Sequence, residues 1–360
     1  DQSGHAGRPV ACRSSRGAAM TSLDELRLLV LVDNATDTLS SIADGVPQTP
    51  EVAQHLPRVP VSRVHEGHPG KVVFDRLCCA AHGLSVLATG RRGQEEHTIL
   101  FDVGPYADIW LGNAARLGVE LAKIDAVFLS HWHFDHSGAL PEVVAALSRA
   151  RWQAGIETPV LVDLHPDRPD QRGTLHPNGT LVLLAPEPTF EAIEAAGGRV
   201  VKHDAPHAIA DGFFFGSGRI DRVTGYEQGL VGHHSFVGDK GHQDPLILDE
   251  RFVAAHVRGR GTSVLSACSH AGVVNSSLGA QAQFHGEPID VVLGGYHLSG
   301  KAMETRIEAT VRDLKARVRP RVVAPGHCTG WRATAALAQA FAPQRYGPSA
   351  VGTMYTLRAS

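Results

Sequence analysis

The chain contains the segment Asp125-Ala126-Val127-Phe128-Leu129-Ser130-His131-Trp132-His133-Phe134-Asp135-His136-Ser137-Gly138, in which an apolar run leads straight into a cluster of polar side chains. Side chains two residues apart in an extended segment point to the same side, so His131 and His133 can bind one metal ion together. After a turn, Asp135 and His136 can face a second position nearby. Imidazole and carboxylate ligands suit zinc, with iron or manganese as alternatives. The spacing therefore predicts a site for two metal ions.

A site of this size needs ligands from other parts of the chain. Further candidates each come directly after an apolar run nearer the C-terminus: Cys268, His270, His297 and His327. A layered α/β fold places its functional residues at such strand ends. We expect His327 and His270 to be metal ligands. His297 is a ligand, a substrate contact or a group that orients a ligand. Cys268 either bridges the metals as a thiolate or is a small buried hydrophobic residue, and for Cys328 we favour burial.

For other aromatic and histidine residues, the sequence gives weaker indications of a functional role. Trp132 and Phe134 would lie at the mouth of the site, either stacking on a flat substrate ring or simply packing. Two histidine pairs lack a strand-end context and are interpreted as solvated loop residues: His203 with His207, and His233 with His234.

Short apolar runs alternate with helical patterns along the chain, which predicts an α/β fold in layers. Strands are expected near 26–32, 84–89, 98–103, 126–130, 159–164, 200, 213, 262–267, 289–293 and 321–324, and helices near 107–117, 139–150, 190–196, 304–317 and 334–341. Residues 20–360 are expected to form one domain, with a loop insertion at about 40–70. Residues 1–19 are expected to be a disordered extension.

The composition narrows the classes of partner. The net charge is −3, and no strongly basic stripe is present, so we expect a small-molecule substrate rather than a nucleic acid. Only five cysteines occur, without a Cys-x-x-Cys pair, which fits a reducing cytoplasm. The apolar run Leu28–Val32 is too short to span a bilayer, so no membrane partner is expected. A homodimer is compatible with the sequence.

The histidine cluster and seven other motifs together resemble the metallo-β-lactamase superfamily. Within it, the chain looks like the branch named for the dihydropterin–ribofuranosylaminobenzene-phosphate synthase of methanopterin biosynthesis. The motifs run in order from VDN (32–34), AHGLS (81–85), ILFDVG (99–104) and LSHWHFDHSGAL (129–140) to SGRIDRVTGYE (217–227), SACSHAGVVN (266–275), LGGYHL (293–298) and APGHCTG (324–330). The branch usually has Gly and Tyr where this chain has Trp132 and Phe134, Glu at Ala81, and Glu-Ile-Pro at 219–221.

The resemblance implies an αββα sandwich of two mixed sheets packed between helices, with the metal site at one edge. It also assigns metal-ligand roles to His131, His133, Asp135, His136, His270 and His327.

The expected activity is hydrolysis of a small phosphoester, ester, lactone or amide by a metal-bound hydroxide, because two zinc ions lower the pKa of a shared water. Asp135 would bind metal and orient this water, and His297 would contact a substrate oxygen or transfer a proton. One alternative is a synthase that acts on a pterin diphosphate, with the metals holding the leaving diphosphate. Another is a metal-binding sensor without catalytic activity.

Overall fold

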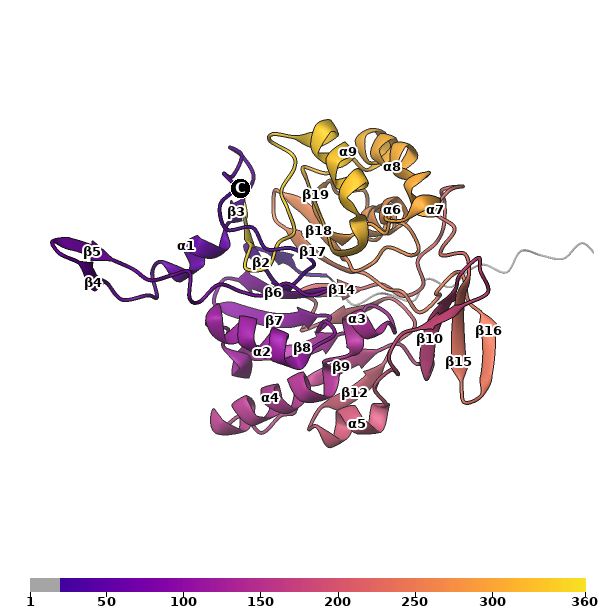
Figure 1. The fold of residues 1–360 in the computed structure, drawn as a ribbon, viewed down its shortest axis with the longest axis horizontal. Helices are drawn as coiled ribbons and strands as arrows, with labels where there is room; N and C mark the ends of the chain where they lie inside the picture. The colour runs from indigo at the N-terminus through magenta and orange to yellow at the C-terminus, as the bar shows by residue number, and fades with distance from the viewer. Residues whose placement is uncertain (1–19) are drawn as a thin grey trace, which may run out of the picture.

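The computed structural model describes residues 20–360, and the expected extension at 1–19 lies outside this range. Two mixed β-sheets pack face to face, and helices cover the outer face of each (Figure 1). This four-layered arrangement confirms the predicted αββα sandwich.

The first sheet has eight strands and carries the histidine motif. Its order is β12 (Arg199–Lys202), β9 (Leu161–Leu164), β8 (Ile124–Phe128), β7 (Glu95–Phe101), β6 (Ser85–Arg92), β2 (Glu25–Val32), β21 (Met354–Arg358) and β3 (Gln48–Thr49). Strands β7, β8, β9 and β12 are parallel. The outer face packs against α2 (Ala107–Arg116), α4 (Leu140–Gln153) and α5 (Phe190–Ala195).

The second sheet comes mostly from the C-terminal half. Its order is β13 (His207–Ile209), β14 (Phe214–Gly216), β17 (Val253–Val257), β18 (Gly261–Ser266), β19 (Ile289–Gly295) and β20 (Val322–Gly326), with β1 (Ser22–Leu23) paired to β17. Strands β18, β19 and β20 are parallel. Their outer face packs against α6 (Val273–Gln283), α8 (Ile307–Asp313) and α9 (Trp331–Phe341).

Strand β2 shows why the two sheets stack. Its residues alternate between two apolar cores, because successive side chains of a strand point to opposite faces. Leu26, Leu28 and Val30 pack between the sheets, whereas Leu29 and Leu31 face the helical layer. A strand that is apolar on both faces must be covered on both, which requires a sheet on one side and helices on the other.

Two smaller sheets extend from the sandwich. One has four antiparallel strands in the order β11 (Leu181–Leu183), β10 (Gln171–Leu175), β15 (His233–Val237) and β16 (Lys240–Gln243). The other pairs β4 (Ser62–His65) with β5 (His68–Gly70), close in sequence to the short helix α1 (Glu51–His55). The segment expected as a loop at about 40–70 therefore contains short regular elements.

The helix expected at 304–317 is present with a later start. It begins as α8 and continues without a break into a π-helical turn at Leu314–Val318, and the short helix α7 (Lys301–Glu304) precedes it. A turn at 305–306 separates α7 from α8, and the Thr305 hydroxyl donates there to the Ala302 carbonyl at 2.7 Å. Within residues 20–360, no helix combines the length and hydropathy needed to cross a membrane.

The carboxyl ends of strands from both sheets meet at one edge of the sandwich. The parallel directions of β7 and β8, and of β18, β19 and β20, bring the segments after these strands to the same edge. The helix α3 (Phe134–Ser137) continues from β8 at this point.

Candidate metal centre

One group of ligand atoms consists of three imidazoles. His131 Nε2 lies 2.9 Å from His133 Nδ1, and His270 Nε2 lies 3.2 Å from the same His133 atom. All three side chains are buried. His131 and His133 follow β8, and His270 follows β18 of the other sheet, so this group, the three-histidine group, joins the two sheets.

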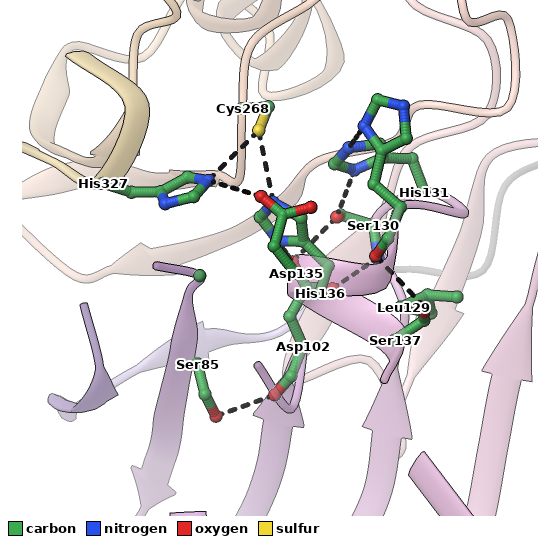
Figure 2. Close-up of polar contacts among 12 residues, drawn as sticks. Ser85, Asp102, Leu129, Ser130, His131, Asp135, His136, Ser137, Cys268 and His327 are labelled. Atoms are coloured by element: carbon green, nitrogen blue, oxygen red, sulfur yellow. Dashed lines mark hydrogen bonds and ion pairs between the residues drawn. The ribbon is translucent and has the colours of Figure 1, made fainter. Parts of the chain in front are cut away.

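A second group combines oxygen, nitrogen and sulfur ligands beside the first (Figure 2). Cys268 Sγ lies 3.2 Å from His136 Nε2 and 3.3 Å from His327 Nε2. Asp135 Oδ2 lies 3.5 Å from His136 Nε2 and 3.2 Å from His327 Nε2. We call these four residues the mixed group. The rings of His131 and His136 lie 4.5 Å apart between centroids, so the two groups are neighbours.

Asp102, at the end of β7, orients one histidine of each group. Its Oδ2 accepts hydrogen bonds from Ser130 Oγ and from His136 Nδ1, each at 2.8 Å. Because the Ser130 hydroxyl donates its hydrogen to Asp102, its oxygen accepts from His131 Nδ1 at 2.8 Å. Both Nδ1 atoms therefore carry hydrogen, which leaves the Nε2 atoms that face the ligand groups as the positions for a metal ion.

His133 is oriented by a histidine from the small four-stranded sheet. His233 Nδ1 donates to the Asp244 carbonyl at 2.7 Å, because a carbonyl can only accept. The Nε2 atom of neutral His233 is then an acceptor, and it receives the hydrogen of His133 Nε2 at 2.9 Å. His133 Nδ1 is left with a lone pair directed at the three-histidine group. In the mixed group, His327 Nδ1 donates likewise to Asn34 Oδ1 at 3.0 Å.

These tautomers fit a bound cation. His131 Nε2 and His133 Nδ1 lie at hydrogen-bond distance, yet both carry lone pairs and no hydrogen bridges them. Two lone pairs at this distance repel each other, and a positive ion between the two nitrogen atoms would remove this repulsion. Burial lowers the pKa of His131, His133 and His270 well below the usual value, so these imidazoles are neutral at pH 7, as metal binding requires.

The mixed group differs in its charge. Burial lowers the pKa of His136, but the carboxylates of Asp135 and Asp102 outweigh this effect and raise the pKa to about 9. Burial also raises the pKa of the Cys268 thiol. Without metal, this group therefore holds protons that a bound ion would displace.

Four non-glycine residues around the candidate centre have left-handed backbone. Asp102, Ser269, His297 and His327 have φ values of 57°, 61°, 43° and 45°. Non-glycine residues adopt this conformation at an energetic cost, and such residues cluster at functional sites. At these positions the strained turns follow strand ends and direct side chains toward the edge of the sandwich.

The other predicted site residues take different positions. His297 is half-buried, with its ring centroid 4.5 Å from that of His270, but it is outside both ligand groups. Phe134 is also half-buried and packs edge-on against Tyr106. Trp132 is fully buried, and its Nε1 donates to the His165 carbonyl at 3.0 Å. Of the two alternatives for Trp132, stacking on a substrate and simple packing, the structure therefore supports packing, in the core under the helices.

The interpretation of two histidine pairs as solvated loop residues was wrong for His207, His233 and His234, which lie in strands β13 and β15. His203 does lie in a loop, with 40% of its side chain exposed. His233 is 2% exposed and contacts His133. His203 Nδ1 and His207 Nε2 both bond Asp163 Oδ2, at 2.8 and 2.7 Å. Their local sequence could not reveal these partners, which lie 40 or more residues away.

Cys328 also differs from its prediction as a buried hydrophobic residue. It is half-buried, and its Sγ lies 3.5 Å from the Cys268 carbonyl oxygen. The thiol therefore has a polar neighbour beside the mixed group.

Sequence reasoning missed several residues of the centre. Asp102 could have been identified, since it is the polar residue that ends the apolar run ILFD. His82 lies in the motif AHGLS, and its Nε2 is 3.6 Å from Asp135 Oδ2, with two thirds of the side chain exposed. Asn34 accepts from His327 and contacts His82 Nδ1 at 2.9 Å.

Comparisons with known proteins show similarities in sequence and in fold. The family model described as the metallo-beta-lactamase superfamily matches residues 83–244. The chain is 29% identical over 267 residues to 7,8-dihydropterin-6-methyl-4-(beta-D-ribofuranosyl)-aminobenzene-5'-phosphate synthase of Methanocaldococcus jannaschii, covering 70% of this chain and 82% of that protein. It is 32% identical over 107 residues to an atrochrysone carboxyl ACP thioesterase of Aspergillus chevalieri, covering 29% of this chain and 31% of that one.

Among solved structures, the fold is similar to that of a metal-dependent hydrolase of the β-lactamase superfamily. The TM-score is 0.62 at 22% identity, and the match covers 93% of this chain and 99% of the other. Residues 83–244 of the chain thus match the metallo-beta-lactamase superfamily in sequence, and the chain as a whole has the fold of a protein of that superfamily.

Proposed function

We propose that the protein is a metallohydrolase that uses two zinc ions to cleave a small phosphoester, ester, lactone or amide. The observation that carries the proposal is the pair of adjacent ligand groups supplied by both sheets. The three-histidine group would hold one ion and the mixed group the other. When bound, zinc acts as a Lewis acid and lowers the pKa of water toward neutrality.

The protein's own residues have separable roles in this proposal. Asp135 lies between the histidines of the mixed group and the exposed His82, so its carboxylate can orient an attacking water. His297 is half-buried beside His270 without belonging to a ligand group, which leaves its ring available to a substrate oxygen. The buried Asp102 and His233 act through the ligands that they orient.

The test is turnover of zinc-loaded protein on phosphodiester, lactone, ester and β-lactam substrates, with zinc content measured on the same samples. His297→Ala should keep both zinc ions and lose turnover. Loss of one zinc equivalent in this variant would make His297 a ligand instead. Bound zinc without turnover on any substrate would overturn the hydrolase proposal and favour a sensor.

The similarity to the Methanocaldococcus jannaschii synthase supports a second candidate, a transferase. In this case the metals would hold the diphosphate of a pterin substrate while a bond to an aminobenzoate-type acceptor forms. Product analysis after incubation with both compounds separates the candidates. A coupled product and released diphosphate would support the synthase, whereas an uncoupled pterin alcohol would support hydrolysis.

A further inference from the structure

We propose a third metal site, formed by Glu51, His55 and Cys78 and separate from both ligand groups described above. Glu51 and His55 are four residues apart in α1 and therefore lie on the same face of the helix. Cys78 reaches them from the connection between β5 and β6. The side chains are almost completely buried, with exposed fractions of 0%, 1% and 7%.

The ligand atoms of these residues have the spacing that a metal ion needs. One atom from each lies within 4.8 Å of the other two. Two atoms that each bind zinc at about 2.0–2.3 Å can be at most about 4.6 Å apart, so small side-chain movements complete the geometry. A carboxylate, an imidazole and a thiol together suit zinc or a similar transition metal, whereas magnesium and calcium prefer oxygen ligands alone.

The two carboxylate oxygens of Glu51 have different environments. Oε1 accepts from the Cys78 backbone N–H and lies 3.0 Å from His55 Nε2. Oε2 is equally buried but has no hydrogen-bond partner. A buried polar atom without a hydrogen-bond partner destabilises the fold, and a charged one does so most. A cation at this position would bind Oε2 and remove this destabilisation.

The carboxylate is also held in place. A Cβ atom built on Gly352 would overlap Glu51 Cγ, so the glycine lets the glutamate stem pack directly against the backbone. Glu51 consequently cannot turn toward solvent to satisfy Oε2 without disrupting this contact. With an ion bound, neutral His55 would carry its hydrogen on Nδ1 and offer the Nε2 lone pair, and the Cys78 thiol would release its proton to solvent.

Such an ion would connect α1 to a segment that reaches the candidate metal centre. Residues 78–82 continue from Cys78 to His82, which lies beside Asp135. Asn113 fixes the same segment by bonding the N–H and the carbonyl of Cys79, at 2.9 and 2.8 Å. The bound ion would thus have a structural role: it would link α1 to residues 78–82 and hold this segment in position.

The primary test compares zinc content in two single variants with adjacent substitutions. Protein is loaded with zinc, freed of excess metal by gel filtration and measured by elemental analysis. Cys78→Ser should lose one zinc equivalent relative to the unsubstituted chain, and the control Cys79→Ser, at an exposed position, should lose none. Equal zinc content in the two variants would overturn the proposal.

Repeating the comparison in a His133→Ala background separates this site from the proposed function. The one-equivalent difference should persist there, even if the centre at the edge of the sandwich holds less metal. A difference that disappears in this background would assign the lost zinc to that centre and overturn the third site.

A cobalt experiment keeps the proposal testable if Cys78→Ser does not fold. A chain with Cys12→Ser, Cys79→Ser, Cys268→Ser and Cys328→Ser retains only the Cys78 thiol, and Co²⁺ bound there should give a thiolate-to-cobalt charge-transfer band. The band should disappear on adding His55→Gln. Absence of the band in the quadruple variant would contradict binding at Cys78.

Discussion

Replacing His233 with alanine should weaken metal binding by the three-histidine group, although His233 is not itself a predicted ligand. Its Nε2 accepts the hydrogen of His133 Nε2, and its own Nδ1 is fixed by the Asp244 carbonyl. The substitution removes the acceptor and leaves a buried N–H of His133 without a partner. The His133 ring then loses both its orientation and the preference for the tautomer with a lone pair on Nδ1.

The magnitude follows from the removal of one orienting hydrogen bond. Loss of a group that orients a metal ligand typically lowers affinity about 10- to 100-fold. This range corresponds to about 1.4–2.8 kcal/mol of binding free energy. We expect an effect in this range, because His131 and His270 retain their positions when His133 loses its acceptor.

Zinc dissociation constants can be measured by competition with a chromophoric chelator. His234→Ala is the matched control, since His234 is the next residue of β15 and its Nδ1 bonds only the Gly232 carbonyl, at 2.9 Å. His233→Gln should recover part of the affinity, because an amide oxygen can accept from His133. Equal zinc affinities of His233→Ala and His234→Ala would refute the proposed orientation of His133.

Three further predictions concern the ligands, their protons and the nearby core. His133→Ala should remove zinc from the three-histidine group and abolish turnover while leaving the circular dichroism spectrum unchanged; zinc stoichiometry equal to that of the unsubstituted chain would be inconsistent with its role as a ligand. Zinc binding near pH 7.5 should release protons from His136, whose pKa is raised to about 9, and from the Cys268 thiol, so apparent affinity should increase as pH rises toward 9. Calorimetry in buffers of different ionisation enthalpy checks this, and zero proton release would be evidence against it. Arg172→Ala should lower the free energy of unfolding by about 3–5 kcal/mol, because it leaves buried Asp249 without the guanidinium that lies 2.7 Å away. A denaturant midpoint and slope equal to those of the unsubstituted protein would contradict this.

The sequence predicts the sandwich well because its strands and helices have clear burial patterns. The run at 26–32 is apolar on both faces, and the structure buries it between the second sheet and the helices. The four-stranded sheet has no such pattern. Strand β16 is exposed along its length, and β11 consists of three exposed apolar residues. Neither matches the alternation that marks a strand with one face in a core.

The candidate ligands were predictable from the sequence where a polar side chain comes directly after an apolar strand pattern. His131 and His136 stand in a dense local motif, and His270 and His327 each follow an apolar run. The ligand roles themselves stay predictions. The environment of His233 depends on a contact with a residue 100 positions away, so no local pattern indicates it.

The central claim is that two zinc ions bind side by side at the edge where the sheets meet. A crystal of zinc-loaded protein measured on both sides of the zinc absorption edge tests it most directly. The account predicts two anomalous peaks about 3.5–4 Å apart, one among His131, His133 and His270 and the other among Asp135, His136, Cys268 and His327. Zinc-loaded crystals without a peak at either group would contradict it.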